Sequence, residues 1–75
     1  MVNYIPHAER QMARRGISKA DVEHVLSDHD VSYPSHVAGR QCYVRSIDGR
    51  RIEVVVEPDD GDHLVITAYD QLTED

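Results

Sequence analysis

The chain has 75 residues, of which 40% are hydrophobic and 29% charged; its formal net charge is -6, and it contains neither Trp nor Phe. A chain of this length supports one hydrophobic core, so we expect a single domain over residues 1–75 with a mostly aliphatic interior. The one cysteine, Cys42, excludes an internal disulfide and a cysteine-rich metal finger.

The N-terminal segment MVNYIPHAER contains a proline and charges where a secretory signal needs an apolar run. The longest uninterrupted apolar runs, such as Val54 to Val56, are far shorter than the ~20 residues of a membrane span. We therefore expect a cytoplasmic protein that does not associate with a membrane.

Two helices are predicted near the N-terminus. Pro6 suits a first helical turn, and two arginines followed by Gly16 suit a last turn, so the pattern predicts a helix over residues 6–15. Ser18 begins the segment SKAD, which has the form of a capping box and predicts a second helix over residues 18–27. The very short connection implies a helical hairpin or corner.

The rest of the chain changes to a period of two. After a loop with one short extended piece around Val31 to Tyr33, segments rich in Val, Ile, Thr and Tyr predict strands over 40–47, 51–57 and 63–69. An Asp-Gly dipeptide favours a tight hairpin turn between the first two, and PDDGD a polar turn between the last two. We therefore predict an α+β fold, with two N-terminal helices packed on one face of an antiparallel three- to four-stranded β-meander.

Side chains alternate across a sheet, so the two faces can be assigned from the sequence. The inward face is predicted to hold Cys42, Val44, Ile52, Val54, Val56, Leu64, Ile66 and Ala68. The opposite face is predicted to hold Tyr43, Arg45, Ile47, Arg51, Glu53, Val55, Glu57, His63, Val65, Thr67 and Tyr69. The second face mixes cations, rings and hydrogen-bonding groups, which makes it the natural place for a functional site.

Binding and cleavage of RNA need guanidinium groups for phosphate, flat rings for bases and a group that moves a proton. The second face offers Arg45 and Arg51 near one hairpin end, Tyr43 and Tyr69 as rings or hydroxyls, and His63 as an imidazole. The same residue types also decorate ordinary half-exposed strands, where cross-strand pairs stabilise the sheet. Both interpretations stay open.

The first predicted helix adds basic side chains. His7 stands at its start, where an imidazole can act as a base or simply cap the helix. Arg10 and Arg14 are four residues apart and share a helix face, which is typical of a solvated surface, while Arg15 points elsewhere.

Metal and cofactor chemistry find no support in the motifs. The five histidines form no HExxH, HxH or His-Cys pattern, and PDDGD lacks the ligand order of an EF-hand loop. The chain also has no Gly-rich phosphate loop and no GxSxG motif. We therefore expect no metal and no cofactor.

The segment HAERQMARRGISKADVEHVL resembles the start of a widespread family of short bacterial domains that is named only as a domain of unknown function. The matching positions are His7, Ala8, Met12, Arg15, Gly16 and Ile17. The segment RIEVVVEPDDGDHLVITAY is similar to the Val-rich hairpin and final strand of that family, with Thr67 and Tyr69 at matching places. The resemblance covers nearly the whole chain, although Gln11 stands where an arginine usually precedes the methionine.

Members of that family look like distant relatives of the RelE-like and BrnT-like toxins of bacterial toxin-antitoxin pairs. The resemblance implies a RelE-like toxin fold and a metal-independent RNA endonuclease, in which the 2′-hydroxyl of the RNA attacks its own phosphodiester and arginines stabilise the phosphoryl charge. The family pattern supplies two candidate catalytic residues and the face assignment supplies four more. The candidates are His7, Arg15, Arg45, Arg51, His63 and Tyr69.

Two hypotheses follow. The first is a ribonuclease that binds RNA and is held in check by an antitoxin protein covering the open face or an edge strand, although a net charge of -6 opposes encounter with phosphate. The second is a non-catalytic adaptor of the same fold that binds a protein partner or self-associates, for example as a dimer, through an edge strand. Catalysis requires Arg45, Arg51 and a histidine to converge on a concave site, whereas the adaptor predicts arginines paired with Glu53 or Glu57.

Overall fold

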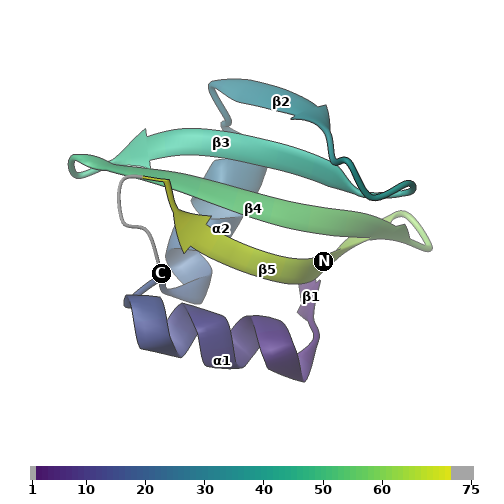
Figure 1. The fold of residues 1–75 in the computed structure, drawn as a ribbon, viewed down its shortest axis with the longest axis horizontal. Helices are drawn as coiled ribbons and strands as arrows, with labels where there is room; N and C mark the ends of the chain where they lie inside the picture. Colours follow the sequence, from purple (N-terminus) through teal and green to yellow (C-terminus); the bar gives the residue numbers. More distant parts are fainter. Residues whose placement is uncertain (1, 72–75) are drawn as a thin grey trace.

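The computed structural model describes residues 2–71, and over this range the chain is α+β, with two helices against one side of a five-stranded sheet (Figure 1). The elements are β1 (Val2–Tyr4), α1 (Pro6–Arg15), α2 (Lys19–Ser27), β2 (Val31–Pro34), β3 (Gln41–Ile47), β4 (Arg50–Asp59) and β5 (Asp62–Asp70). The predicted fold class is confirmed. Neither described helix has the length and apolar composition needed to cross a membrane.

α1 spans the predicted residues, and α2 begins at Lys19, one residue later than predicted, because Ser18 is its N-cap. α1 starts at Pro6 and stops at Gly16, whose φ of 66° is left-handed, as glycine tolerates. α2 is capped by Ser18, whose hydroxyl accepts a hydrogen bond from the Asp21 amide at 3.0 Å. The Asp21 carboxylate accepts one in return from the Ser18 amide at 3.2 Å, which completes the predicted capping box.

The sheet order is β1-β5-β4-β3-β2. Strands β2 to β5 pair antiparallel, as predicted, and β2 occupies the short extended piece expected after α2. β1 was not predicted, and it pairs parallel with β5, so the sheet is mixed and has five strands rather than three or four. Three residues are too few to show a period, and only the free edge of β5 fixes their conformation.

Both long hairpins turn on an Asp-Gly dipeptide. Asp48 and Gly49 have φ values of 49° and 80°, and Asp60 and Gly61 have 49° and 85°, which is the positive-φ geometry of a two-residue turn. The first turn confirms the prediction. The second is tighter than predicted, because β4 and β5 extend into PDDGD until Asp59 pairs with Asp62.

The face assignment of β3 was wrong. The two-residue turn places Ile47 opposite Arg50, and this register sets Tyr43 opposite Val54 and Cys42 opposite Val55. Directly opposite residues point to the same face of a sheet. The residues of β3 that therefore lie on the helix side are Gln41, Tyr43, Arg45 and Ile47, and those that lie on the other side are Cys42, Val44 and Ser46.

The face assignment of β5 was wrong in part, because of a bulge. The register shifts between Val55 and Val56, so that these residues pair with Thr67 and Val65, and Ile66 is the extra residue. Val65, and not its two neighbours, therefore joins the core, where it is fully buried. Beyond the bulge, Thr67 and Tyr69 lie on the predicted open face.

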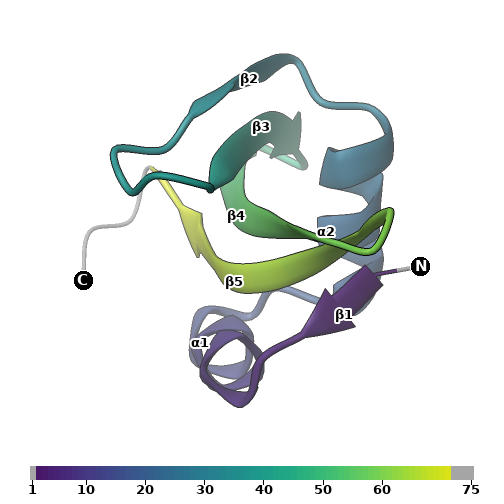
Figure 2. The same ribbon diagram turned by 90° about the vertical axis from the view of Figure 1, so that its right-hand side faces the viewer.

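The core lies between the helices and the sheet, and it is aliphatic as predicted. It is formed by Ala8, Met12, Ile17, Val22, Val25, Ile52, Val54, Val56, Val65 and Ala68. The sheet is curled rather than flat, with β2 and the loop after it arching over the side that the helices leave open (Figure 2). We call this side the concave face; it carries Tyr33, Cys42, Glu53, Val55, Thr67 and Tyr69.

Candidate functional site

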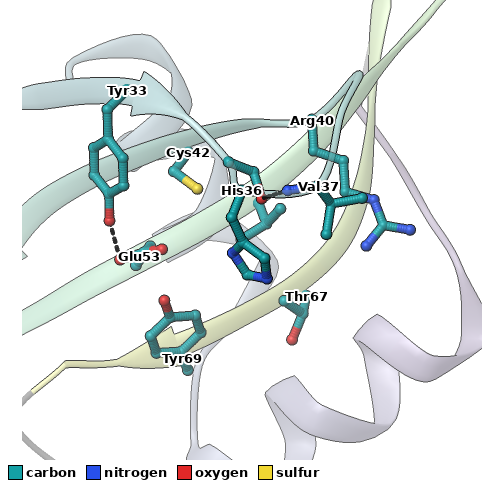
Figure 3. A pocket seen from close by; sticks show the side chains of 10 residues that line it. Tyr33, His36, Val37, Arg40, Cys42, Glu53, Thr67 and Tyr69 are labelled. Carbon is teal, nitrogen blue, oxygen red and sulfur yellow. Dashed lines mark hydrogen bonds between the residues drawn. The ribbon is translucent and has the colours of Figure 1, made fainter.

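The concave face holds a pocket of about 420 Å³ under the β2–β3 loop (Figure 3). Strands β2 to β5 and this loop all contribute to its wall. Its polar lining includes Tyr33, Ser35, His36, Arg40, Cys42, Glu53, Thr67 and Tyr69. The curl of the sheet thus gathers side chains that lie up to half the chain apart in sequence.

Glu53, which as a residue is only 3% exposed, forms the floor of the pocket. One of its oxygens, Oε1, accepts hydrogen bonds from the Tyr33 hydroxyl and from the Gln71 side-chain amide, both at 2.6 Å. The carboxylate also accepts hydrogen bonds from the Tyr69 hydroxyl and the Cys42 thiol. A buried carboxylate is tolerated when donors surround it in this way, so the cluster ties β2, β3, β4 and β5 together.

The cluster fixes the protonation states of its members. Burial acts to raise the pKa of Glu53, but hydrogen bonds from Tyr33, Tyr69, Gln71 and Cys42 outweigh it and lower the pKa below its ordinary value. The hydrogen bond to Glu53 raises the pKa of Tyr33 to about 12, and burial followed by the same carboxylate raises that of Tyr69. Burial also raises the pKa of the Cys42 thiol. At neutral pH the pocket therefore contains one carboxylate and protonated phenol and thiol donors.

The β2–β3 loop brings His36 and Arg40 to the rim of the pocket. The loop is closed by the Ser35 amide, which donates to the Arg40 carbonyl at 3.0 Å, and by the Arg40 amide, which donates to the Val37 carbonyl at 3.2 Å. Gly39, with a φ of 85°, supplies the left-handed residue that this closure needs. Figure 3 shows the His36 ring pointing down into the pocket.

Arg40 is held by an ion pair at the edge of the pocket. Its Nε lies 2.9 Å from Oε2 of Glu57 on β4. The two side chains are 32% and 38% exposed, so water screens the attraction between them. Within residues 2–71, the two terminal nitrogens of Arg40 make no hydrogen bond, and a ligand can approach them.

Arg45 and Arg51, the two arginines proposed from the sequence, come together on Asp30 and not on a histidine. Arg51 Nη1 lies 2.9 Å from Asp30 Oδ2 and 3.0 Å from Ser46 Oγ. Arg45 Nη1 donates to the Asp28 carbonyl at 2.8 Å and lies 3.7 Å from Asp30 Oδ1. The hydrogen bond from Arg51 holds the pKa of Asp30 below its ordinary value. Both arginines are therefore paired with acids of the connection between α2 and β2, which does not line the pocket.

The other candidates are dispersed. His7 is exposed at the start of α1, whereas Arg15, at the far end of that helix, donates to the Ala68 carbonyl at 3.1 Å. The Arg15 carbonyl accepts a hydrogen bond from Arg50 at 2.7 Å, so this region joins α1 to the sheet. Of the six sequence-derived candidates, Tyr69 is the one that lines the pocket on the concave face.

His63 lies on the helix side of the sheet, the same side as the fully buried Val65 two residues later. Its predicted face was therefore wrong. Its ring meets the ring of Tyr43 edge-on, with centroids 5.8 Å apart. The Tyr43 ring also packs against His29, at 4.7 Å. His63 and Tyr43 line a smaller hollow of about 260 Å³ between β3, β4 and β5.

Glu53 was expected on the open face, but only as an ion-pair partner for an arginine. The sequence did contain a signal for Glu53, because this acid interrupts an apolar segment, between Ile52 and the Val54 to Val56 run. A carboxylate buried in a central strand needs hydrogen-bond donors around it. His36 and Arg40 gave no such signal. They belong to a loop, SHVAGR, whose closure over the sheet depends on tertiary contacts.

The pocket suits a hydrogen-bonding or anionic ligand better than a metal ion. Glu53 already accepts several hydrogen bonds, and the remaining groups include an imidazole, a guanidinium, phenols and a protonated thiol. Among the described residues, no three His, Cys, Asp or Glu side chains gather as metal ligands would.

Comparison with known proteins gives one match. Residues 4–70 match the family described as a domain of unknown function, DUF4258. No curated protein and no solved structure matches the chain. The match spans every described element except the first residues of β1, and it includes the segments HAERQMARRGI and VITAY. The chain therefore belongs to the DUF4258 family of domains of unknown function.

Proposed function

We propose that this chain is a metal-independent RNA endonuclease whose active site is the pocket on the concave face. The observation that supports this proposal is that His36, Arg40 and two tyrosines line one pocket, in which Glu53 accepts a hydrogen bond from Tyr33. Metal-free cleavage of RNA uses these types of side chain: a proton carrier, a cation for the phosphoryl oxygens and rings for the bases. Arg40 and His36 thus take the roles first assigned to Arg45, Arg51 and His63.

In the proposed reaction the 2′-hydroxyl of a nucleotide attacks the adjacent phosphorus. His36 accepts the proton of that hydroxyl, a bond forms between the 2′-oxygen and phosphorus, and the bond from phosphorus to the 5′-oxygen breaks. The proton is then returned from the imidazole to the departing 5′-oxygen, which leaves a 2′,3′-cyclic phosphate and a free 5′-hydroxyl. Arg40 stabilises the negative charge that builds on the phosphoryl oxygens.

The remaining groups position the substrate. Glu53 keeps the hydroxyls of Tyr33 and Tyr69 in place, and its own saturation with donors makes it a positioning residue rather than a base. Tyr33 is 38% exposed, which leaves ring surface on which a base can stack.

In this proposal the protein is the toxin of a bacterial toxin-antitoxin pair and acts in the cytoplasm. The resemblance of its family to RelE-like and BrnT-like toxins supports this setting. An antitoxin would inhibit the enzyme by covering the mouth of the pocket between β2 and β5, or by pairing with the free edge of β2.

The test is induced expression of the wild type beside His36→Ala and Arg40→Ala, with growth and RNA integrity as readouts, followed by cleavage assays with purified protein. We expect each substitution to lower cleavage about 100-fold or more, the loss typical of an acid-base group or a phosphate-binding cation. His7→Ala and the pair Arg45→Ala/Arg51→Ala serve as matched controls, since they remove the same side-chain types elsewhere.

Each outcome identifies a site or removes the proposal. Activity lost in the controls and kept in His36→Ala would move the site to the residues proposed from the sequence. Intact RNA and normal growth with well-folded wild type would exclude the ribonuclease.

A specific observation favours a second candidate function, that of a protein-binding adaptor. Arg45 and Arg51 are neutralised by Asp28 and Asp30, and the edge strand β2 exposes Val31 by 45%. In this case the wild type leaves RNA intact, and substitution of Val31 by Lys abolishes capture of the partner. A neutralised arginine pair beside an exposed edge strand is compatible with pairing to another protein's strand.

A further inference from the structure

The ion pair between Arg40 and Glu57 lies at the edge of the pocket, where a phosphate would have to bind. Arg40 contacts Glu57 through Nε, at 2.9 Å, and its Nη1 and Nη2 fork is the part left for a ligand. Glu57 belongs to β4, two residues beyond Val55 on the wall of the pocket. In the free protein the cation of the pocket is therefore already matched by a carboxylate of the protein itself.

We propose that Glu57 is a gate, which holds the Arg40 guanidinium in the free protein and is displaced when the phosphodiester of a single-stranded RNA binds there. This inference rests on the proposed function, because it assumes that RNA is the ligand of the pocket. Glu57 is a positioning residue in this scheme, since it acts through Arg40 and does not touch the reacting atoms.

The two partners differ in how firmly they are held. The backbone of Arg40 is fixed by hydrogen bonds to Ser35 and Val37 within the loop, so its side chain stays anchored at the rim when its partner leaves. Glu57 is 38% exposed near the end of β4, opposite Leu64, and its carboxylate can turn into water. An exposed pair of this kind is weak and can be exchanged for a better one.

A phosphodiester is a better partner for Arg40 than Glu57. Two phosphoryl oxygens can accept from two guanidinium nitrogens at once, whereas Glu57 uses Nε. The carboxylate also repels the phosphate as long as it stays at the rim. Ligands without a phosphate cannot recover the lost ion pair, so the gate favours a nucleic-acid strand over a neutral ligand.

The experiment measures binding separately from cleavage. The probe is a short single-stranded RNA with 2′-O-methyl groups, which cannot be cleaved, and the readout is its fluorescence anisotropy with wild type, Glu57→Gln, Arg40→Ala and the double variant. Asp60→Asn is the matched control, because Asp60 is an exposed carboxylate in the turn at the end of β4 and asparagine tolerates its φ of 49°. Circular dichroism confirms that each variant is folded.

We expect Glu57→Gln to lower the Kd for this RNA about fivefold, the effect of removing a weak competing ion pair, and Asp60→Asn to change it less than about twofold. In the Arg40→Ala background, Glu57→Gln should lower the Kd for the RNA no more than Asp60→Asn does. The proposed gate would be overturned if Glu57→Gln and Asp60→Asn changed the Kd equally, or if Glu57→Gln lowered the Kd fivefold in the absence of Arg40 as well. If Glu57→Gln behaves as the control while cleavage still depends on His36 and Arg40, the gate alone fails; if the wild type neither binds nor cleaves RNA, both proposals fail.

Discussion

The two faces of β4 bury their side chains in different ways. On the helix side, Ile52, Val54 and Val56 are at most 2% exposed and meet aliphatic side chains of both helices. On the concave face, Glu53 is equally inaccessible at 3% but is surrounded by hydroxyl, thiol and amide donors. The first face needs only matched volume, whereas the second needs directed hydrogen bonds. The second face is thus the one whose side chains are held by the direction of hydrogen bonds as well as by packing.

The largest expected effect is on the helix side. Ile52→Ala should lower the free energy of unfolding by about 3 kcal/mol, since it removes buried methyl groups and leaves a cavity between the sheet and the helices. Urea denaturation followed by circular dichroism measures this loss. A loss below about 1 kcal/mol would mean that the helices repack over the gap, and that the two faces differ less than their packing suggests.

Glu53→Gln tests whether the concave face depends on its charge. The amide that replaces one carboxylate oxygen would face donors instead of accepting from them, so we expect a loss of about 2 kcal/mol in unfolding free energy. Glu57→Gln on the same strand is the control, and the exposure of that ion pair limits its effect to about 0.5 kcal/mol. Equal losses from both substitutions would show that the buried cluster adds nothing beyond a surface ion pair.

The pH dependence of stability should sharpen the same contrast by a smaller amount. The folded pKa of Glu53 is lower than its ordinary value of 4.5, so the folded state favours the ionised carboxyl. This stabilisation is complete above the pKa of the unfolded chain and is lost as the pH falls through the folded pKa. Unfolding free energies at about pH 7 and about pH 3 should therefore differ more in the wild type than in Glu53→Gln.

Asp30, whose pKa is also lowered, is present in both of these proteins, and its contribution cancels in the difference. An identical acid-induced loss in the two proteins would contradict the assignment of the lowered pKa to Glu53.

The local elements could be read directly from the sequence. Pro6 and Gly16 set the limits of α1, Ser18 and its capping box set the start of α2, and the Asp-Gly turn set the first hairpin. Each of these signals acts through hydrogen bonds or φ angles within a few residues, so it does not depend on the rest of the fold. The face of β3 could also have been predicted from the sequence. A two-residue turn pairs Ile47 with Arg50, and this pairing places odd-numbered residues of β3 opposite even-numbered residues of β4.

Only the tertiary structure decided the remaining features. The bulge at Ile66 places Val65 in the core instead of its neighbours Leu64 and Ile66, which were predicted there. β1 takes its conformation from the free edge of β5. The site itself arises because the curl of the sheet brings Tyr33 across to Glu53 and closes the loop of His36 and Arg40 over them. The physical reason is range: periodicity and capping act along the chain, whereas a buried carboxylate and its donors meet through contacts between strands distant in sequence.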